Sequence, residues 1–328
     1  MGAGATSGLL EVSQAALNAP KTGSLRVWLQ GARPRTLGAG IAPVFVGAGA
    51  AGHVVWWRLV AALIVAIGLQ VGVNLANDYF DGIRGVDTSE RIGPPRLVSS
   101  GAASAGAVLW AAVACIGVAA VAGLALALAT SLLLVLPVGA LALLAAIGYS
   151  GGPRPYASLG LGEVMVFVFF GLLATCGTSY VMVQRVPAAA WWCGSALGLL
   201  AVAILVANNL RDIPTDEAAG KRTLAVRIGD ENTRNLYRAC VIGAFATIAS
   251  GMALYIPWPQ FGATQWILFG LAAWPLAIKP MQAVGRATGR ELIPVLTGTA
   301  ATHAACGALL TLGLVLSRTV HQPSHPLP

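Results

Sequence analysis

The stretch AALIVAIGLQVGVNLANDYFD, residues 61–81, joins a long apolar run to a strongly polar end. The run approaches the roughly 20 residues that a helix needs to cross a bilayer. The polar residues follow at intervals that place them on one helical face: Gln70, Asn74, Asn77 or Asp78, and Asp81. Because a carboxylate is costly in lipid, such residues normally face a bundle interior or an aqueous cavity. The stretch therefore predicts a transmembrane helix that ends in a polar site.

The whole chain has the composition of a membrane protein. It has 328 residues, of which 57% are hydrophobic and 10% charged, and its mean hydropathy is +0.76. A soluble protein would carry about 25% charged residues. Continuous apolar runs recur along the chain, which favours helices over alternating strands. We therefore predict an all-α, polytopic transmembrane helix bundle with a central cavity capped on the cytoplasmic side.

We expect about nine helices, with the third and fourth divided only weakly at Thr130 and Ser131. The expected ranges are 30–52, 57–81, 103–125, 129–149, 159–183, 190–213, 233–256, 262–279 and 291–316. Residues 1–21 lack the basic start and apolar core of a signal peptide and are expected to be a disordered lead-in. Residues 22–318 form a single predicted transmembrane domain, followed by a polar tail, 319–328.

The basic residues are distributed unevenly across this topology. With the N-terminus in the cytoplasm, 17 of the 20 Lys and Arg residues fall on the cytoplasmic side, and Arg58, Arg185 and Arg318 fall on the other. This bias follows the positive-inside rule. It predicts an integral protein of a bacterial-type plasma membrane, with the N-terminus and active-site loops in the cytoplasm and the C-terminus outside. Topology explains much of the net charge of +8, so no nucleic-acid partner is expected.

Two cytoplasmic regions, residues 78–96 and 208–227, carry the same order of polar residues when the helix end before the first is included. In each, an asparagine and an aspartate four positions apart close an apolar helix: Asn74 and Asp78 in the first, Asn208 and Asp212 in the second. Carboxylates follow, and then basic residues. The later carboxylates are Asp81, Asp87, Asp216 and Glu217, and the basic residues are Arg84, Arg91, Arg96, Lys221, Arg222 and Arg227. Pro214 leaves open whether Asp216 still lies on the second helix.

Carboxylates gathered at one membrane surface repel each other unless cations bind between them. Hard oxygen ligands suit Mg²⁺, which is usually held by one or two carboxylates together with substrate phosphates. Lys and Arg side chains just beyond the carboxylates suit the remaining phosphate oxygens. The combination predicts a metal–diphosphate site. Helix caps and interface charges explain one such region about as well, but two regions with shared spacing favour function.

At these residues the sequence resembles the UbiA superfamily of intramembrane prenyltransferases. The resemblance is carried by NDYFD, GVD and NNLRDIPTDEAAGKRTLAVRIG, and it extends from RPRT, residues 33–36, to the last helix. The segments NDYFDGIRGVD, RIGPPRLVSSG, GYSGGPRPY, LGEVMVFVFFG and NNLRDIPTD look most like the 1,4-dihydroxy-2-naphthoate polyprenyltransferase branch, MenA. This implies transfer of a polyprenyl group from polyprenyl diphosphate to 1,4-dihydroxy-2-naphthoate. Loss of CO₂ and diphosphate would give demethylmenaquinone, a step of menaquinone biosynthesis.

The resemblance also implies a site in which two Mg²⁺ ions bridge the carboxylates and the donor diphosphate. The catalytic residues and metal ligands would be Asp78, Asp81, Asp212 and Asp216, with Asp87, displaced from the general superfamily spacing, as a further metal ligand. The substrate-binding residues would be Asn74, Asn208, Lys221, Arg222, Arg84, Arg91, Arg96, Tyr149 and Arg154. The expected partners are a polyprenyl diphosphate, an aromatic acceptor and the lipid bilayer. The sequence predicts no oligomeric state.

Four further side chains have two interpretations each. Arg33 and Arg35 could bind an acceptor carboxylate, although positive-inside anchoring explains them more simply. Glu163 suits the first turn of its helix, where the helix dipole favours a carboxylate, and it could also face the cavity. His303 is expected to be a hydrogen-bonded packing residue rather than a base.

Two other functions are compatible with parts of this pattern. A prenyltransferase of the same superfamily could use another aromatic acceptor, such as 4-hydroxybenzoate or homogentisate. A cation or phosphate transporter could also contain intramembrane Asp and Asn residues, but its carboxylates should lie near the middle of the membrane. The carboxylates here are clustered at one surface, which favours the enzyme.

Overall fold

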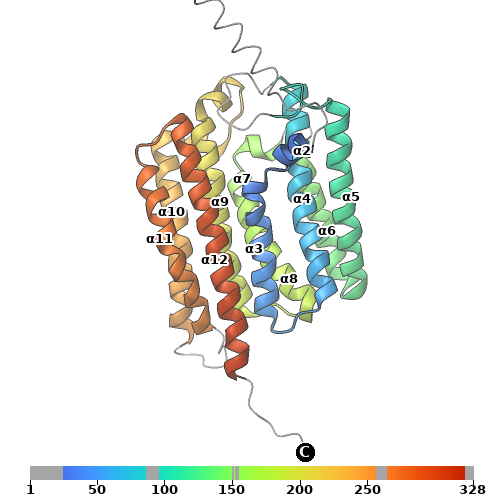
Figure 1. The fold of residues 1–328 in the computed structure, drawn as a ribbon, viewed down its shortest axis with the longest axis vertical. Coiled ribbons are helices and arrows are strands. Elements are labelled where there is room, and N and C mark those ends of the chain that lie inside the picture. Colours follow the sequence, from blue (N-terminus) through green and yellow to red (C-terminus); the bar gives the residue numbers. More distant parts are fainter. Residues whose placement is uncertain (1–24, 86–95, 150, 152–154, 256–263, 322–328) are drawn as a thin grey trace, which may run out of the picture.

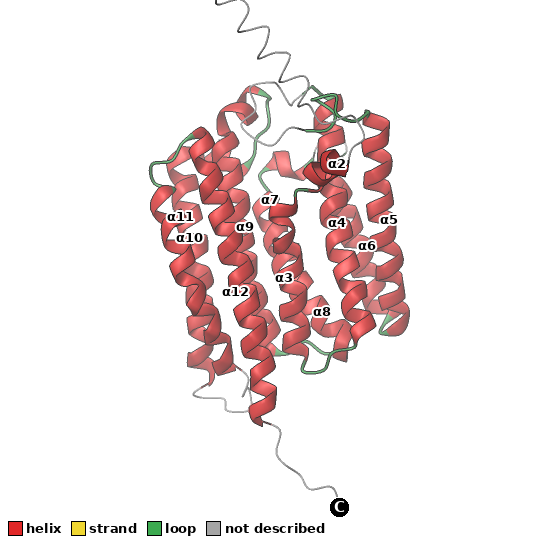
Figure 2. Ribbon diagram, viewed as in Figure 1, coloured by secondary structure: helices red, strands yellow, loops and turns green. Residues whose placement is uncertain are grey.

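The computed structural model describes residues 25–85, 96–149, 151, 155–255 and 264–321. The described residues are helical throughout, joined by short loops, and none of them forms a strand (Figure 2). This confirms the predicted all-α fold. The expected lead-in, 1–21, lies outside the described residues. The last helix runs to His321, slightly past the expected start of the polar tail at 319.

The helices follow one another along the chain with few long connections. Their bounds are α2 (Leu25–Ala32), α3 (Pro34–Ala51), α4 (Trp56–Ile83), α5 (Ala105–Ala129), α6 (Leu132–Gly148), η1 (Tyr156–Leu159), α7 (Gly162–Val166), η2 (Phe167–Leu173), α8 (Ala174–Val183), α9 (Ala188–Ala218), α10 (Leu224–Tyr255), η4 (Thr264–Ala273), α11 (Trp274–Ala283), η5 (Gly289–Glu291) and α12 (Leu292–His321). The segments α7, η2 and α8 run on without a break, as do η4 and α11. Counted in this way, the described ranges contain nine long helical rods and the short helix α2.

Five helices are long and apolar enough to cross a membrane, and two shorter apolar helices lie at Thr36–Ala51 and Leu132–Gly148. The chain is therefore an integral membrane protein. The rods run side by side from one end of the bundle to the other (Figure 1). The most central of these helices is α9. In its apolar stretch 72% of the residues are buried, whereas in the apolar stretch of α5 only 22% are buried. The largest core cluster surrounds α9 and includes residues of α10 and α12.

The sequence located most helix boundaries within a few residues. The weak division at Thr130 and Ser131 is confirmed, since α5 ends before Thr130 and α6 begins after Ser131. Within α10 the backbone at Gly229 is not helical, with φ 79° and ψ 174°, so a short helix from Leu224 precedes the long one. The long helix begins after Gly229, within a few residues of the expected start at 233.

Helix α9 continues through Pro214 to Ala218, beyond its expected end at 213. A proline in a helix removes its own backbone hydrogen bond, but here only the last turn follows it. The Thr215 hydroxyl donates to the Asp212 carbonyl at 2.9 Å, a further hydrogen bond within this last turn. As a result, Asp212 and Asp216 lie one turn apart on the same face of α9.

Candidate active site between the ends of α4 and α9

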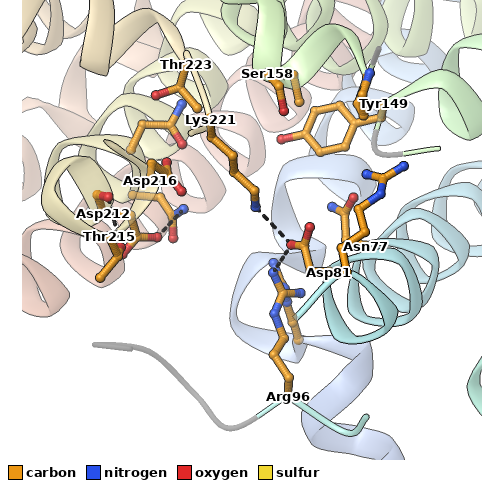
Figure 3. Close-up of a pocket in the computed structure, with 16 residues that line it drawn as sticks. Asn77, Asp81, Arg96, Tyr149, Ser158, Asp212, Thr215, Asp216, Lys221 and Thr223 are labelled. Atoms are coloured by element: carbon orange, nitrogen blue, oxygen red, sulfur yellow. Dashed lines mark hydrogen bonds and ion pairs between the residues drawn. The ribbon is translucent and has the colours of Figure 1, made fainter. Parts of the chain in front are cut away.

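The polar ends of α4 and α9 meet at the same end of the bundle and border one pocket (Figures 1 and 3). Its volume is about 120 Å³, whereas a single water molecule needs roughly 10–15 Å³. The pocket can therefore hold several small polar groups. It is lined by Arg33, Asn77, Asp81, Arg84, Arg96, Tyr149, Pro155, Ala157, Ser158, Asn208, Asn209, Asp212, Thr215, Asp216, Lys221 and Thr223.

On the α4 side of the pocket, Asp81 is buried and receives two cationic side chains. Lys221 Nζ donates to Asp81 Oδ2 at 3.2 Å, and Arg96 Nη2 donates to the same oxygen at 3.3 Å. Lys221 reaches across the pocket from the segment after α9, as Figure 3 shows. The chain turns there at Gly220, whose φ of 72° favours glycine, and the Lys221 amide closes the turn on the Asp216 carbonyl at 2.8 Å. Asp81 thus joins the two predicted motifs.

On the α9 side, Asp212 is neutralised within its own helix. Arg211 Nε and Nη2 donate to the two Asp212 oxygens, each at 2.7 Å. Asn208 Nδ2 donates to Asp212 Oδ2 at 3.3 Å, and Arg211 Nη2 also donates to Asn208 Oδ1 at 2.9 Å. A bidentate Arg–carboxylate pair of this kind fixes the orientation of both groups. Asp216 lies on the pocket wall one turn further along.

The structure changes which asparagine of α4 belongs to the pocket. Asn77 lines it, whereas Asn74 does not and instead donates through Nδ2 to the Ala32 carbonyl at 3.4 Å. The expected match of Asn74 with Asn208 is therefore shifted by three residues. The pairs that line the pocket are Asn77 and Asp81 on α4 and Asn208 and Asp212 on α9, each pair with a spacing of four. The sequence contained this signal, because both registers are visible in NLANDYFD, but spacing alone does not choose between them.

Asp78 also lies apart from the pocket-lining residues. Its side chain is buried, and its oxygens accept hydrogen bonds from the backbone N–H groups of Leu97, at 2.8 Å, and Val98, at 3.0 Å. The metal-ligand role expected for Asp78 therefore has no support from its position. Asp78 and Asp81 lie three residues apart on α4, but Asp78 contacts the backbone at residues 97 and 98, whereas Asp81 contacts Arg96 and Lys221.

Several other predicted residues are placed clearly. Arg84 and Arg96 line the pocket, and the Arg84 guanidinium also lies 5.4 Å from the centre of the Phe80 ring. Arg222 is exposed and does not line the pocket, so its expected contact with diphosphate is not supported by its placement. Asp87, Arg91 and Arg154 lie outside the described residues, as does the side chain of Arg35.

The side of the pocket away from α9 carries aromatic and basic groups. The Tyr149 hydroxyl points into the pocket (Figure 3), and its ring meets Tyr156 edge to face with centroids 5.5 Å apart. Burial raises the pKa of Tyr149 to about 12, although the nearby Arg33 guanidinium opposes the rise. The phenol is therefore neutral and can donate a hydrogen bond. Arg33, between α2 and α3, has a left-handed backbone with φ 55° and ψ 62°. Such strain in a non-glycine residue is typical of functional sites.

Sequence reasoning named Glu163 but missed its partner on α9, Asn209. Asn209 lines the pocket and donates through Nδ2 to Glu163 Oε1 at 3.0 Å. Glu163 is buried at the start of α7, so it supports the wall instead of facing the cavity. His303 is fully buried in α12 and does not line the pocket, as expected of a packing residue. The hydrogen bond also expected of it is not found, because neither ring nitrogen has a partner of ordinary hydrogen-bond geometry among the described residues.

The donor set of the pocket fits a hard divalent cation. Carboxylates of Asp81, Asp212 and Asp216 and amide groups of Asn77 and Asn208 surround one space. Within the described ranges, no three His, Cys, Asp or Glu side chains are already arranged around a common point. Such a set of separate carboxylates suits Mg²⁺, which commonly takes one or two of them and completes its shell with water and substrate phosphates.

Comparisons with known proteins agree with this geometry. The model of the UbiA prenyltransferase family matches residues 40–286. A 1,4-dihydroxy-2-naphthoate octaprenyltransferase from Mycobacterium tuberculosis is 47% identical over 285 residues, which cover 84% of this chain and 92% of that protein. The Escherichia coli protein with the same description is 37% identical over 310 residues, covering 89% of this chain and 96% of the relative.

Solved structures show a similar fold. A UbiA homolog from Archaeoglobus fulgidus bound to DMAPP and Mg²⁺ has a TM-score of 0.55 and 16% identity, covering 88% of this chain and 99% of that chain. An apo UbiA homolog from Aeropyrum pernix K1 has a TM-score of 0.59 and 18% identity, covering 85% of this chain and 97% of that chain. At these identities the likeness supports the helical architecture.

Proposed function

Because the chain belongs to the UbiA prenyltransferase family, we propose that the pocket between α4 and α9 is its active site. The reaction is prenylation of 1,4-dihydroxy-2-naphthoate in menaquinone biosynthesis, the activity named for relatives that match most of the chain. The allylic C–O bond of the donor breaks and its electron pair leaves with diphosphate. The ring carbon that carries the carboxylate forms the new C–C bond, and CO₂ then leaves its electron pair in the ring. The product is demethylmenaquinone in its hydroquinone form.

The observation that carries this proposal is the ion pair between Lys221 and Asp81. It brings together two motifs that are 140 residues apart in the sequence. Around it, carboxylates, amides and guanidinium groups share one pocket at a membrane-protein helix end. An apolar bundle would not be expected to gather these groups unless their charge balanced that of a ligand.

Asp81, Asp212 and Asp216 would hold Mg²⁺, with Asn77 and Asn208 beside them, and we propose two ions. When bound, Mg²⁺ supplies Lewis-acid stabilisation of the negative charge on the diphosphate. Lys221, Arg96 and Arg84 would contact the remaining phosphate oxygens. These side chains stabilise charge that grows as the C–O bond breaks, and the surrounding helices exclude water from the allylic cation.

The opposite wall of the pocket suits the aromatic acceptor. Arg33 offers a cation for the acceptor carboxylate, and the neutral Tyr149 hydroxyl offers a hydrogen bond to an acceptor oxygen. Arg154 and Arg91 are also proposed as substrate contacts, from the sequence alone. On the sequence bias of basic residues, this end of the bundle faces the cytoplasm of a bacterial-type plasma membrane and the C-terminus lies outside.

The direct test uses purified protein in lipid nanodiscs with a polyprenyl diphosphate, 1,4-dihydroxy-2-naphthoate and Mg²⁺. We expect prenylated product, released diphosphate and loss of activity on chelation that added Mg²⁺ restores. Asp216→Asn should lower kcat by about 100-fold. Glu217→Gln is the matched control, because Glu217 is the exposed neighbour of Asp216 and does not line the pocket.

Three results would contradict the assignment. Product with 4-hydroxybenzoate or homogentisate, but none with 1,4-dihydroxy-2-naphthoate, would assign the chain to another acceptor within the same family. Equal activity of Asp216→Asn and Glu217→Gln would remove the pocket from the reaction. Ion movement across proteoliposomes without any consumption of diphosphate would favour a transporter.

A further inference from the structure

The segment that follows the undescribed residues 86–95 is attached to α4 through Asp78. Asp78 is 2% exposed, and its Oδ2 and Oδ1 accept the backbone N–H groups of Leu97 and Val98. The segment then turns tightly before α5. The Gly101 amide donates to the Val98 carbonyl, and the Ala103 amide donates to the Leu97 carbonyl, each at 3.0 Å. Both carboxylate oxygens therefore accept backbone donors, and Asp78 does not line the pocket.

Two glycines make room for this contact. A Cβ atom on Gly82, one helical turn after Asp78, would lie 2.5 Å from Val98 Cγ1 and 2.6 Å from Val98 Cβ. A Cβ atom on Gly31 of α2 would lie 2.7 Å from Leu97 Cδ1. Leu97 itself is buried in the cluster that includes Val27 and Leu75. The side chains of Leu97 and Val98 thus pack closely against Gly31 of α2 and Gly82 of α4, in a space that larger residues at 31 or 82 would fill.

The residue before this attachment is Arg96, whose guanidinium reaches Asp81 inside the pocket. Asp78 and Asp81 are three residues apart on α4, so neighbouring faces of one helix hold the backbone and the side chain of the same short segment. Hydrogen bonds from N–H groups to a carboxylate are among the stronger ones in proteins. Fixing the backbone at 97 and 98 therefore limits where the Arg96 guanidinium can go.

From this geometry we propose that Asp78 is a positioning residue that seats residues 96–98 on α4 and so directs Arg96 to the donor diphosphate, and that it does not bind metal. The part concerning diphosphate rests on the proposed function. The seat itself rests on the two hydrogen bonds and the close approach of Gly82. Asp78 does not line the pocket and its oxygens accept backbone N–H groups, whereas Asp81 and Asp212 line the pocket and are paired with side chains.

The experiment compares Asp78→Asn with Gly82→Ala, since both disturb the seat but only one changes a carboxylate. Hydrogen–deuterium exchange of residues 96–103 in nanodiscs should become about tenfold faster in both variants, because each loses contacts that protect the Leu97 and Val98 amides. Asp230→Asn, which alters an exposed ion pair with Arg234, is the control and should leave this exchange unchanged. Unchanged exchange in both Asp78→Asn and Gly82→Ala would contradict the proposal that Asp78 holds residues 96–98 on α4.

Metal binding separates positioning from ligation. At saturating inorganic pyrophosphate, with binding followed by electron paramagnetic resonance, Asp78→Asn and Gly82→Ala should bind the same amount of Mn²⁺ as the unmodified protein, whereas Asp81→Asn should lose it. Loss of Mn²⁺ from Asp78→Asn, with binding retained in Gly82→Ala, would make Asp78 a ligand and contradict the proposal.

Kinetics test the link to Arg96. Both seat variants should raise the KM for the polyprenyl diphosphate about as much as Arg96→Ala does, and adding Arg96→Ala to either should raise it little further. Fully additive effects would show that Asp78 does not act through Arg96. Exchange and Mn²⁺ binding need no turnover. An unmodified protein that fails to prenylate would therefore contradict the proposed function, and the two measurements would still test whether Asp78 holds residues 96–98 on α4.

Discussion

The polar ends of α4 and α9 share a spacing of amide and carboxylate residues, but their carboxylates are neutralised from different parts of the chain. Asp81 on α4 pairs with Lys221, which follows α9, and with Arg96, which precedes α5. Asp212 on α9 pairs with the adjacent Arg211 and with Asn208 one turn earlier. The α9 end is therefore organised within one helix, whereas the α4 end requires two loops to be in place.

This difference suggests separate roles for the two ends. Arg211 is held by a bidentate contact and is almost fully buried, so it is suited to fixing Asp212. Lys221 is more exposed, with 25% of its side chain accessible, and holds Asp81 through a single contact. A diphosphate with its cations could replace Lys221 at Asp81 more easily than it could replace Arg211 at Asp212. The α4 end is thus the side that we expect to rearrange when the donor binds.

The largest expected effect tests whether both ends are needed. Asp81→Asn and Asp212→Asn should each lower kcat by about 10²–10³-fold, because each removes charge that stabilises the leaving diphosphate. Steady-state assays in nanodiscs would measure this, with Asp230→Asn as an exposed carboxylate control. Near-normal turnover in either pocket variant would mean that the two ends are not parts of one site.

Stability should distinguish the ends next. Arg211→Met leaves Asp212 buried without its bidentate partner and should cost about 3–5 kcal/mol of unfolding free energy. Lys221→Met should cost at most about 1 kcal/mol, because Lys221 is partly exposed and Asp81 keeps Arg96. Thermal unfolding in detergent, followed by tryptophan fluorescence, compares the two. Equal shifts in Tm would remove the contrast between local and long-range pairing.

A smaller effect is expected from the adjacent cations after α9. Lys221→Ala should raise the KM for the polyprenyl diphosphate about tenfold, as one charge-assisted hydrogen bond to phosphate is lost. Arg222→Ala should change it by less than about twofold, because Arg222 is exposed and outside the pocket lining. The reverse result would place Arg222, the other basic residue expected from the sequence, at the donor site.

The smallest expected effect concerns Tyr149. Its raised pKa of about 12 keeps the phenol protonated at every pH below that value, so it donates a hydrogen bond and does not titrate near neutrality. Tyr149→Phe should lower kcat/KM for the acceptor about threefold to tenfold and leave the shape of the pH profile between pH 6 and about pH 9 unchanged. A lost alkaline limb in Tyr149→Phe would show that the phenol titrates during the reaction.

The amino-acid sequence by itself determined the helical bundle and the composition of the site. Long apolar runs can form little else in lipid, because backbone groups there must bond within the segment. Carboxylates at the ends of such runs likewise need a cavity or a counter-ion. These local requirements were enough to find the nine helical rods of the described ranges, the break at Thr130, and the pocket residues Asp81, Asp212, Asp216 and Lys221.

Only the tertiary structure decided which member of each polar group faces the pocket. Helical spacing places Asn74, Asn77, Asp78 and Asp81 on one broad face, and the packing of residues 96–98 then assigns Asp78 to the backbone and leaves Asn77 and Asp81 in the pocket. In the same way, the turn at Gly220 brings Lys221 to Asp81 and leaves Arg222 exposed. The physical reason is that periodicity fixes an angle around one helix, whereas a contact also depends on what neighbouring segments bring to that angle.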